Sequence, residues 1–83
     1  MLSFIPTPIG NIEDITIRAK RLLTELSVFF CEDTRTTKKL LRLYDIEYTH
    51  KQFFSLTSFT SDATLLKYVN LATDTHCGVV SDA

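Results

Sequence analysis

The sequence predicts an α/β fold with an open, mostly parallel sheet and flanking helices. Four short runs rich in branched and aromatic residues alternate with three stretches of helical periodicity, which gives the order β-α-β-α-β-α-β. The predicted strands cover residues 2–5, 27–31, 52–56 and 77–81. Strands that alternate with helices pair in parallel through right-handed crossovers, and nearly continuous apolar strands suit a sheet that is covered on both faces.

The first strand, LSFI, runs through the turn PTPIGN into the first predicted helix. The apolar residues of this helix fall at helical spacing and form one stripe that can cover a sheet. They are Ile15, Ala19, Leu22, Leu23 and Leu26. Asn11 and Asp14 are the candidate N-caps, because either side chain can accept a hydrogen bond from a free backbone amide.

The second strand, SVFFC, leads into a helix that should begin near Asp33 or Thr34. One face of this helix carries Thr37, Leu40, Leu41 and Tyr44, and the other carries a basic stripe of Arg35, Lys38, Lys39 and Arg42. A polyanion could bind along this stripe, and an ordinary solvated helix face is the alternative interpretation.

The third strand, QFFSL, precedes a helix whose polar start offers Thr60 or Ser61 as the N-cap. Its predicted inner face consists of Leu65, Leu66, Val69 and Ala72. The fourth strand, CGVVS, follows. With 83 residues, the chain is shorter than a usual domain of about 100–150 residues, and residues 1–83 are interpreted as one incomplete α/β domain.

Composition excludes several classes of protein. Nine basic and ten acidic side chains nearly cancel, so binding of nucleic acid would depend on a local patch. Cys31 and Cys77 lie in apolar segments without ligand spacing, which predicts reduced thiols and no metal site. No secretory leader and no apolar run of about 20 residues is present, which predicts a soluble cytoplasmic protein without a membrane partner.

Three polar segments follow predicted strands, namely PTPIGN, EDTR and SDA. The carboxyl ends of parallel strands meet at one edge of a sheet, where ligands bind, so these segments are expected to lie together. Pro6 and Pro8 lack amide hydrogens, and Gly10 alone makes a poor phosphate cradle. An adenosine-containing ligand with an uncharged or cationic middle fits this loop better, and a proline-fixed turn without a ligand is the alternative.

The EDTR segment places two carboxylates, a hydroxyl and a guanidinium at the end of a strand. In a purely structural interpretation, Asp33 caps the second helix and Glu32 pairs with Arg35. In a functional interpretation, a carboxylate accepts a proton from a hydroxyl group and Arg35 binds a phosphate.

Three motifs, PTPIGNIEDITIRA, CEDTRTTKKLL and VVSDA, together resemble the ribosomal RNA small-subunit methyltransferase I branch of the tetrapyrrole methylase family. The resemblance implies a two-domain enzyme, of which this chain is an N-terminal fragment that is inactive alone. It implies that the enzyme uses S-adenosylmethionine to methylate the ribose 2′-hydroxyl of a cytidine in small-subunit ribosomal RNA. It also implies that the ribosomal RNA or the small ribosomal subunit is the partner and that the full protein is a homodimer.

The resemblance also implies site residues, position by position. The family's cofactor loop matches Pro6, Thr7, Pro8, Ile9, Gly10 and Asn11, and the start of its SDAGTP segment matches Asp82 and Ala83. The catalytic candidates are Glu32, Asp33 and Arg35, and the candidates for substrate binding are Arg35, Lys38, Lys39 and Arg42. Many relatives carry a histidine- and asparagine-containing segment where this chain has SLTSFTS at residues 55–61, which leaves the RNA site open.

Other functions stay open at this point. An enzyme with the same fold could methylate a tetrapyrrole or another small molecule. The spacing between Gly10 and Glu32 also fits a non-catalytic module that binds adenine or a dinucleotide. A unit that serves only folding or assembly, through the exposed edge of its last strand, is the remaining alternative.

Overall fold

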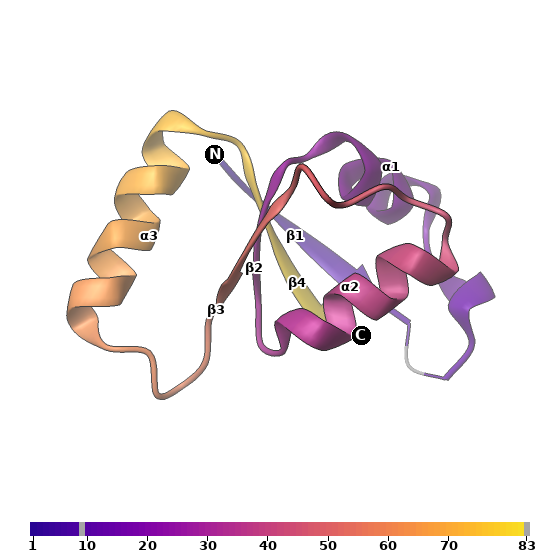
Figure 1. The fold of residues 1–83 in the computed structure, drawn as a ribbon, viewed down its shortest axis with the longest axis horizontal. Helices are drawn as coiled ribbons and strands as arrows, with labels where there is room; N and C mark the ends of the chain where they lie inside the picture. The colour runs from indigo at the N-terminus through magenta and orange to yellow at the C-terminus, as the bar shows by residue number, and fades with distance from the viewer. Residues whose placement is uncertain (9, 83) are drawn as a thin grey trace.

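A computed structural model describes residues 1–8 and 10–82 (Figure 1). The strands are β1 (Leu2–Thr7), β2 (Val28–Cys31), β3 (Gln52–Ser55) and β4 (Cys77–Asp82). The helices are α1 (Ile17–Glu25), α2 (Thr34–Leu43) and α3 (Asp62–Asp74), with a short 3-10 turn, η1 (Ile12–Asp14), before α1. The predicted alternation of strands and helices is confirmed. Two predicted cofactor residues, Ile9 and Ala83, lie outside the described residues.

The four strands form one parallel sheet in the order β1-β4-β2-β3. The chain therefore moves across the sheet in one direction from β1 through β2 to β3, and then returns to place β4 in the middle. Right-handed connections put helices on opposite faces when the direction reverses. Figure 1 shows this arrangement, with α1 and α2 on one side of the sheet and α3 on the other.

The first face of the sheet, under α1 and α2, holds the larger core. Its buried residues are Ile5, Ala19, Leu22, Leu23, Leu26, Phe29 and Leu41. The apolar stripe predicted for the first helix supplies four of them, and Leu41 comes from the predicted inner face of the second helix. Phe29 stacks on Phe53 with ring centroids 5.6 Å apart, which extends this core to the edge strand β3.

The second face, under α3, is covered only in part. Its buried cluster consists of Val28, Phe30, Ala72 and Cys77. The Tyr68 ring packs 4.7 Å from the Phe30 ring, and its hydroxyl donates to the Ser55 carbonyl, so α3 is fixed against β2 and β3. The expectation of a sheet covered on both faces is therefore wrong near β1, where Phe4 is 66% exposed. The predicted inner face of the third helix is also wrong in large part, because Leu65, Leu66 and Val69 are exposed and only Ala72 of the four is buried.

The sequence predicted the N-cap correctly for two of the three α-helices. Asp33 caps α2 and Ser61 caps α3, as predicted. At α1 the prediction is wrong: Thr16 is the N-cap, and its side chain accepts from the Ala19 amide. Asn11 instead caps η1, because residues 12–14 form a separate 3-10 turn and the α-helix begins only at Ile17.

Lys51 is the one charged residue in the buried set of the described chain, with 7% of its surface exposed. Its ammonium group donates to the carbonyls of Thr24, at 2.9 Å, and Leu26, and lies 5.5 Å from the centre of the Phe29 ring. The last carbonyls of a helix have no partner within the helix. Lys51 therefore satisfies the carboxyl end of α1 from the segment before β3, and burial lowers its pKa.

Candidate functional site

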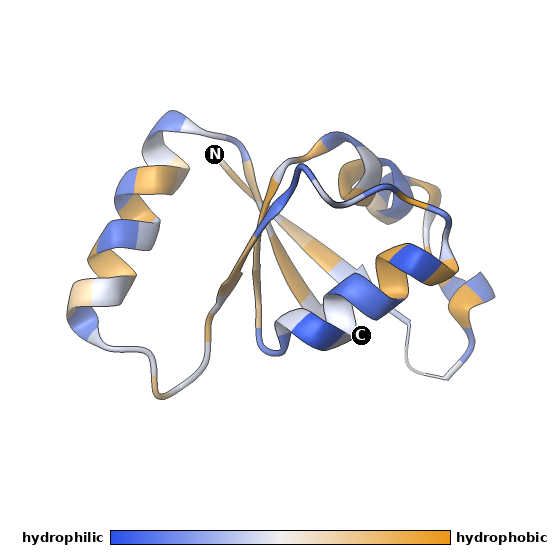
Figure 2. Cartoon of the chain, viewed as in Figure 1, coloured by the Kyte–Doolittle hydropathy of each residue, from blue (hydrophilic) through white to orange (hydrophobic). Residues whose placement is uncertain are grey.

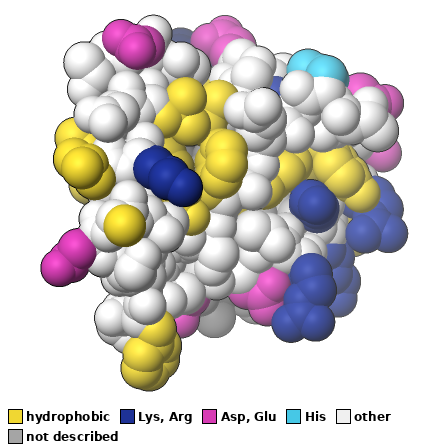
Figure 3. All heavy atoms as spheres, turned by 60° about the vertical axis from the view of Figure 1, so that its left-hand side comes forward, with side chains coloured by type: hydrophobic (Ala, Val, Ile, Leu, Met, Phe, Trp, Pro, Cys, Tyr) yellow, Lys and Arg dark blue, Asp and Glu magenta, His cyan; other side chains and the backbone are white. Residues whose placement is uncertain are grey.

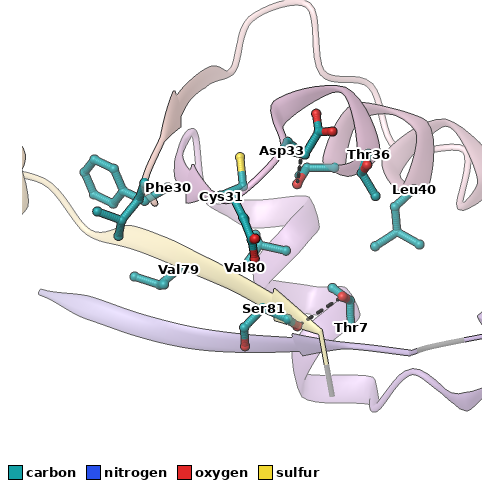
Figure 4. A pocket seen from close by; sticks show the side chains of 12 residues that line it. Thr7, Phe30, Cys31, Asp33, Thr36, Leu40, Val79, Val80 and Ser81 are labelled. Atoms are coloured by element: carbon teal, nitrogen blue, oxygen red, sulfur yellow. Dashed lines mark hydrogen bonds between the residues drawn. The ribbon is translucent and has the colours of Figure 1, made fainter. Parts of the chain in front are cut away.

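A cavity of about 580 Å³ opens where β1, β2 and β4 end and α2 begins (Figure 4). The predicted convergence of strand ends is confirmed, since Thr7, Glu32 and Ser81 come from three different strand ends and line the same cavity. The full lining consists of Thr7, Phe30, Cys31, Glu32, Asp33, Thr36, Thr37, Leu40, Leu56, Val79, Val80 and Ser81.

Thr7 joins the ends of two neighbouring strands. Its hydroxyl donates to the Ser81 carbonyl at 3.1 Å, the bond drawn in Figure 4, and only 4% of the residue is exposed. β1 and β4 pair in register to Thr7 and Asp82, so this bond holds the lower wall of the cavity together. Of the described residues in the predicted cofactor loop, Thr7 is the one that lines the cavity. Pro6, Pro8, Gly10 and Asn11 lie outside its lining.

Gly10 adopts a backbone conformation that requires glycine. Its φ is +92°, in a region that residues with a Cβ rarely adopt. No heavy atom lies within 4 Å of the position of an added Cβ. The glycine is therefore needed for the turn between β1 and η1. Close approach of a neighbouring atom within the described chain does not explain it.

Asp33 and Arg35 are bonded to each other. Asp33 Oδ1 accepts from the Arg35 backbone amide at 3.0 Å and from Arg35 Nε at 3.3 Å, and Oδ2 accepts from Arg35 Nη2 at 3.4 Å. These hydrogen bonds lower the pKa of Asp33. The Arg35 side chain is 90% exposed and that of Asp33 is 45% exposed, so solvent screens the ion pair and it contributes little to stability. The structural interpretation that paired Glu32 with Arg35 is wrong, because the guanidinium turns to Asp33.

Glu32 lines the cavity from the end of β2. Within the described residues, no hydrogen bond or ion pair engages its carboxylate, and the neighbouring guanidinium is held by Asp33. Glu32 is therefore the carboxylate of the cavity that is free to receive a ligand group.

The first two turns of α2 contribute residues that the sequence analysis did not assign to the site. Thr36 and Leu40 face Thr7 and Ser81 across the cavity in Figure 4. Thr37 is buried and donates to the Asp33 carbonyl at 3.4 Å. Cys31 lies beside them, and burial raises the pKa of its thiol. Their place at the start of the second helix could have identified these residues from the sequence, because the start of a helix that follows a parallel strand lies at the ligand-binding edge of the sheet.

The basic stripe of α2 lies outside the cavity lining. Arg35, Lys39 and Arg42 are exposed, whereas Lys38 is half-buried with its ammonium group 5.3 Å from the centre of the Phe53 ring. Figure 3 shows Lys and Arg side chains gathered on one side of the molecular surface. The predicted stripe therefore exists as an exposed cationic face of α2, with Lys38 held against β3.

The described residues contain no group of three or more His, Cys, Asp or Glu side chains that could hold a metal ion. None of the helices in this part of the chain combines the length and the apolarity that a membrane span requires.

Comparison with known proteins gives consistent matches. Residues 1–76 match the family model described as Tetrapyrrole (Corrin/Porphyrin) Methylases. Over 82 residues the chain is 51% identical to a ribosomal RNA small subunit methyltransferase I of Mycoplasma pneumoniae and 42% identical to one of Mycoplasma genitalium, covering 99% of this chain in both cases. A protein of the same name from Campylobacter fetus is 36% identical over 88 residues and is matched by the whole chain. The chain spans 30%, 30% and 32% of these three relatives.

Proposed function

Because the chain belongs to the tetrapyrrole methylase family, we propose that the complete protein is a methyltransferase that acts on small-subunit ribosomal RNA with S-adenosylmethionine as methyl donor. The names of the three relatives include that RNA. In this proposal the acceptor is the ribose 2′-hydroxyl of a cytidine. The protein acts as a homodimer in the cytoplasm, and residues 1–83 belong to an N-terminal domain that is inactive alone.

The observation that carries the proposal is the chemistry of the cavity at the carboxyl ends of the strands. Its volume of about 580 Å³ suits a small-molecule ligand. The lining combines apolar side chains such as Leu40, Val79 and Val80 with the carboxylates of Glu32 and Asp33, and contains no Lys or Arg. An adenosine group with a cationic sulfonium and an ammonium fits such a site, whereas a pyrophosphate would meet the free carboxylate of Glu32, and the neighbouring guanidinium of Arg35 is held by Asp33.

These residues therefore fit S-adenosylmethionine, which would supply a methyl group activated on a sulfonium. The apolar wall from α2 and β4 can bind the adenosine, and the hydroxyls of Thr7 and Thr36 offer polar contacts beside it. Positions 6–11, 82 and 83 remain proposed cofactor contacts on the strength of the motif. Of them, Thr7 supports the assignment by lining the cavity.

The methyl transfer itself needs alignment of the ribose hydroxyl and a group that accepts its proton. In the proposal, the carboxylate of Glu32 accepts this proton at Oε1 or Oε2. Asp33 is a weaker candidate base, because the hydrogen bonds from Arg35 occupy both of its oxygens and lower its pKa. Arg35, Lys38, Lys39 and Arg42 bind phosphates of the RNA, although Lys38 packs against Phe53 and the Arg35 guanidinium is bonded to Asp33.

The test is methyl transfer by the full-length protein to small-subunit ribosomal RNA, measured with radiolabelled S-adenosylmethionine. Glu32→Gln should lower kcat by about 100-fold or more, since removal of a general base costs about that much. Glu25→Gln, an exposed carboxylate on α1 outside the cavity lining, is the matched control and should leave kcat unchanged.

Absence of transfer to ribosomal RNA by the unsubstituted enzyme, under conditions in which a relative is active, would contradict the substrate. Equal kcat for Glu32→Gln and Glu25→Gln would contradict the role of Glu32. Calorimetry separates the cofactor from the alternative of a dinucleotide: S-adenosylmethionine should bind and NAD should not, and the reverse result would contradict the cofactor assignment.

A further inference from the structure

The loop between β3 and α3, residues 56–61, presents an aromatic ring to solvent. Phe59 is 93% exposed, the largest value for a large apolar side chain in the described chain, and it belongs to neither buried cluster. The other residues that follow Leu56 in this loop are Ser and Thr, and Figure 2 colours most of the loop close to white. A single exposed apolar side chain is common on protein surfaces, so the surroundings of Phe59 decide whether it has a task.

The backbone that carries Phe59 is fixed by its own hydrogen bonds. The Thr57 amide donates to Thr60 Oγ1 at 2.9 Å, and the Thr60 amide donates back to the Thr57 carbonyl at 3.1 Å. The Phe59 amide donates to Thr57 Oγ1 at 3.1 Å. Before the turn, the Tyr68 hydroxyl donates to the Ser55 carbonyl at 2.7 Å and joins the end of β3 to α3. A turn that is already ordered loses little conformational entropy when its aromatic side chain binds a partner.

The loop starts at the cavity. Leu56 lines the cavity, and its amide donates to the Cys31 carbonyl at 2.9 Å. Three residues of chain span about 11 Å at most, so the Phe59 backbone lies within that distance of Leu56. α2 begins three residues after Cys31, and Figure 1 shows the loop and the start of α2 at the same end of the sheet. An exposed aromatic ring and a cationic helix face therefore border the same cavity.

We propose that Phe59 stacks on a nucleobase of a single-stranded RNA segment whose phosphates bind the cationic face of α2. The inference rests on the proposed function, since it takes ribosomal RNA as the substrate. Proteins bind single-stranded nucleic acid by combining cationic groups along its backbone with aromatic rings that stack on its bases. A base held on Phe59 would fix the strand at a second point beside the cavity and so help to align the ribose that enters it.

The composition of the loop favours a nucleobase over other partners. Residues 53–61 contain no charged side chain, so this loop offers nothing to a phosphate or to a charged peptide. An apolar protein surface would need a contiguous apolar patch on this loop, whereas Ser58 and Thr60 flank Phe59. A nucleobase is flat and uncharged, and its polar edges can remain in water or meet the neighbouring hydroxyl groups.

The test is binding of the full-length protein to small-subunit ribosomal RNA, measured by filter binding at several salt concentrations. Phe59→Ala should weaken binding about tenfold, as the loss of one stacked base does. The slope of log affinity against log salt should stay unchanged, because no phosphate contact is removed. Ile17→Ala, at a residue of α1 that is 89% exposed, is the matched control and should leave the affinity unchanged.

Two further variants separate stacking from a simple apolar contact. Phe59→Trp keeps an aromatic face and should retain the affinity. Phe59→Leu keeps an apolar side chain without that face and should lose about as much affinity as Phe59→Ala. Full affinity in Phe59→Leu would overturn the proposal.

The remaining outcomes distinguish this inference from the function on which it rests. Unchanged affinity in Phe59→Ala, with firm binding by the unsubstituted protein, would overturn the role of Phe59 and leave the proposed function standing. A lower urea midpoint of unfolding in Phe59→Ala would also overturn it, because the ring would then pack against another part of the longer chain. Failure of the unsubstituted protein to bind the RNA would contradict the proposed function itself.

Discussion

Two buried side chains, Ile5 and Phe29, pack against β4 at the position where a side chain of residue 78 would lie. A Cβ at this position would lie 2.6 Å from Ile5 Cδ1 and 3.0 Å from Phe29 Cδ1, both closer than ordinary contact. Ile5 and Phe29 are fully buried in the larger core, so neither can move aside freely. The glycine at position 78 is therefore a packing requirement.

Gly78→Ala should reduce the free energy of unfolding by about 1–3 kcal/mol, the usual cost of an extra methyl group in a packed core. Ile5→Val removes the Cδ1 atom that the new methyl group would strike. The double variant should therefore lose less stability than the sum of the two single variants, as measured by urea unfolding. Strictly additive losses would contradict a clash between these two residues.

The buried ammonium group of Lys51 makes the stability of the protein depend on pH. Burial lowers its folded-state pKa below 10.5, so between the two values the folded state binds fewer protons than the unfolded state. The contribution of Lys51 to the free energy of unfolding therefore increases as the pH is raised from its folded-state pKa towards 10.5. At neutral pH, Lys51→Met should still cost about 1–3 kcal/mol, because two carbonyls lose their donor.

Urea unfolding at several pH values checks this expectation. The stability difference between the unsubstituted protein and Lys51→Met should widen at alkaline pH, since other titrating groups cancel in the difference. Lys67→Met, at an exposed lysine on α3, is the control and should change the free energy of unfolding little, as substitutions at the surface usually do. A difference for Lys51→Met that narrowed as the pH rose would contradict the lowered pKa.

At the scale of elements, helix α2 combines two surfaces with different tasks. Its buried Thr37 and Leu41 join the sheet, and its first turn forms a wall of the cavity. Its exposed face carries Arg35, Lys39 and Arg42. A cationic helix face that begins at a ligand cavity can bind a polyanion whose reacting end enters that cavity.

Lys39→Glu should weaken RNA binding by the full-length protein and reduce the slope of log affinity against log salt by about one, the contribution of one phosphate contact. Lys67→Glu, which reverses a charge on α3 on the other side of the sheet, is the matched control and should have little effect. A filter-binding titration at several salt concentrations measures both. Similar effects of the two reversals would favour a small-molecule substrate over RNA.

The sequence predicted the strands and helices themselves better than the packing between them. Apolar periodicity identified the four strands and three helices, because each is long enough to show its own pattern. It wrongly assigned Leu65, Leu66 and Val69 to the inner face of α3, since periodicity reveals an apolar stripe and says nothing about what covers it. The cap of α1 was missed because a local 3-10 turn competes for Asn11, which periodicity does not detect.

The candidate site was predictable in its location and less so in its lining. Parallel strands meet at their carboxyl ends, so Thr7, Glu32 and Ser81 could be brought together from the sequence. The pairing of Asp33 with Arg35 could not, because it depends on the side-chain geometry of the first helical turn. The walls from Thr36 and Leu40 depend on how α2 sits over the sheet.

At the scale of the whole molecule, residues 1–83 expose one apolar face and cover the other. The exposed apolar residues on the second face, Leu2 and Phe4 of β1 with Leu65 and Val69 of α3, should therefore cause self-association when this segment is produced alone. Phe4→Glu should lower concentration-dependent light scattering, because it places a charge on the face. Leu43→Glu, at an exposed leucine on α2, is the control and should lower it little. Equal effects would show that general surface charge, and not this face, controls association.

The central place of β4 also determines when the sheet can assemble during synthesis. Among the described strands, β1 pairs only with β4, in a register that joins Leu2 to Cys77, so the first strand to be synthesised remains unpaired until the last described strand is made. Contacts so distant in sequence close slowly, and until they form the emerging chain holds β1 unpaired beside a nascent β2–β3 pair. A ribosome therefore has to release residues up to 82 before the two ends meet, and this interval is when the chain has most need of a chaperone.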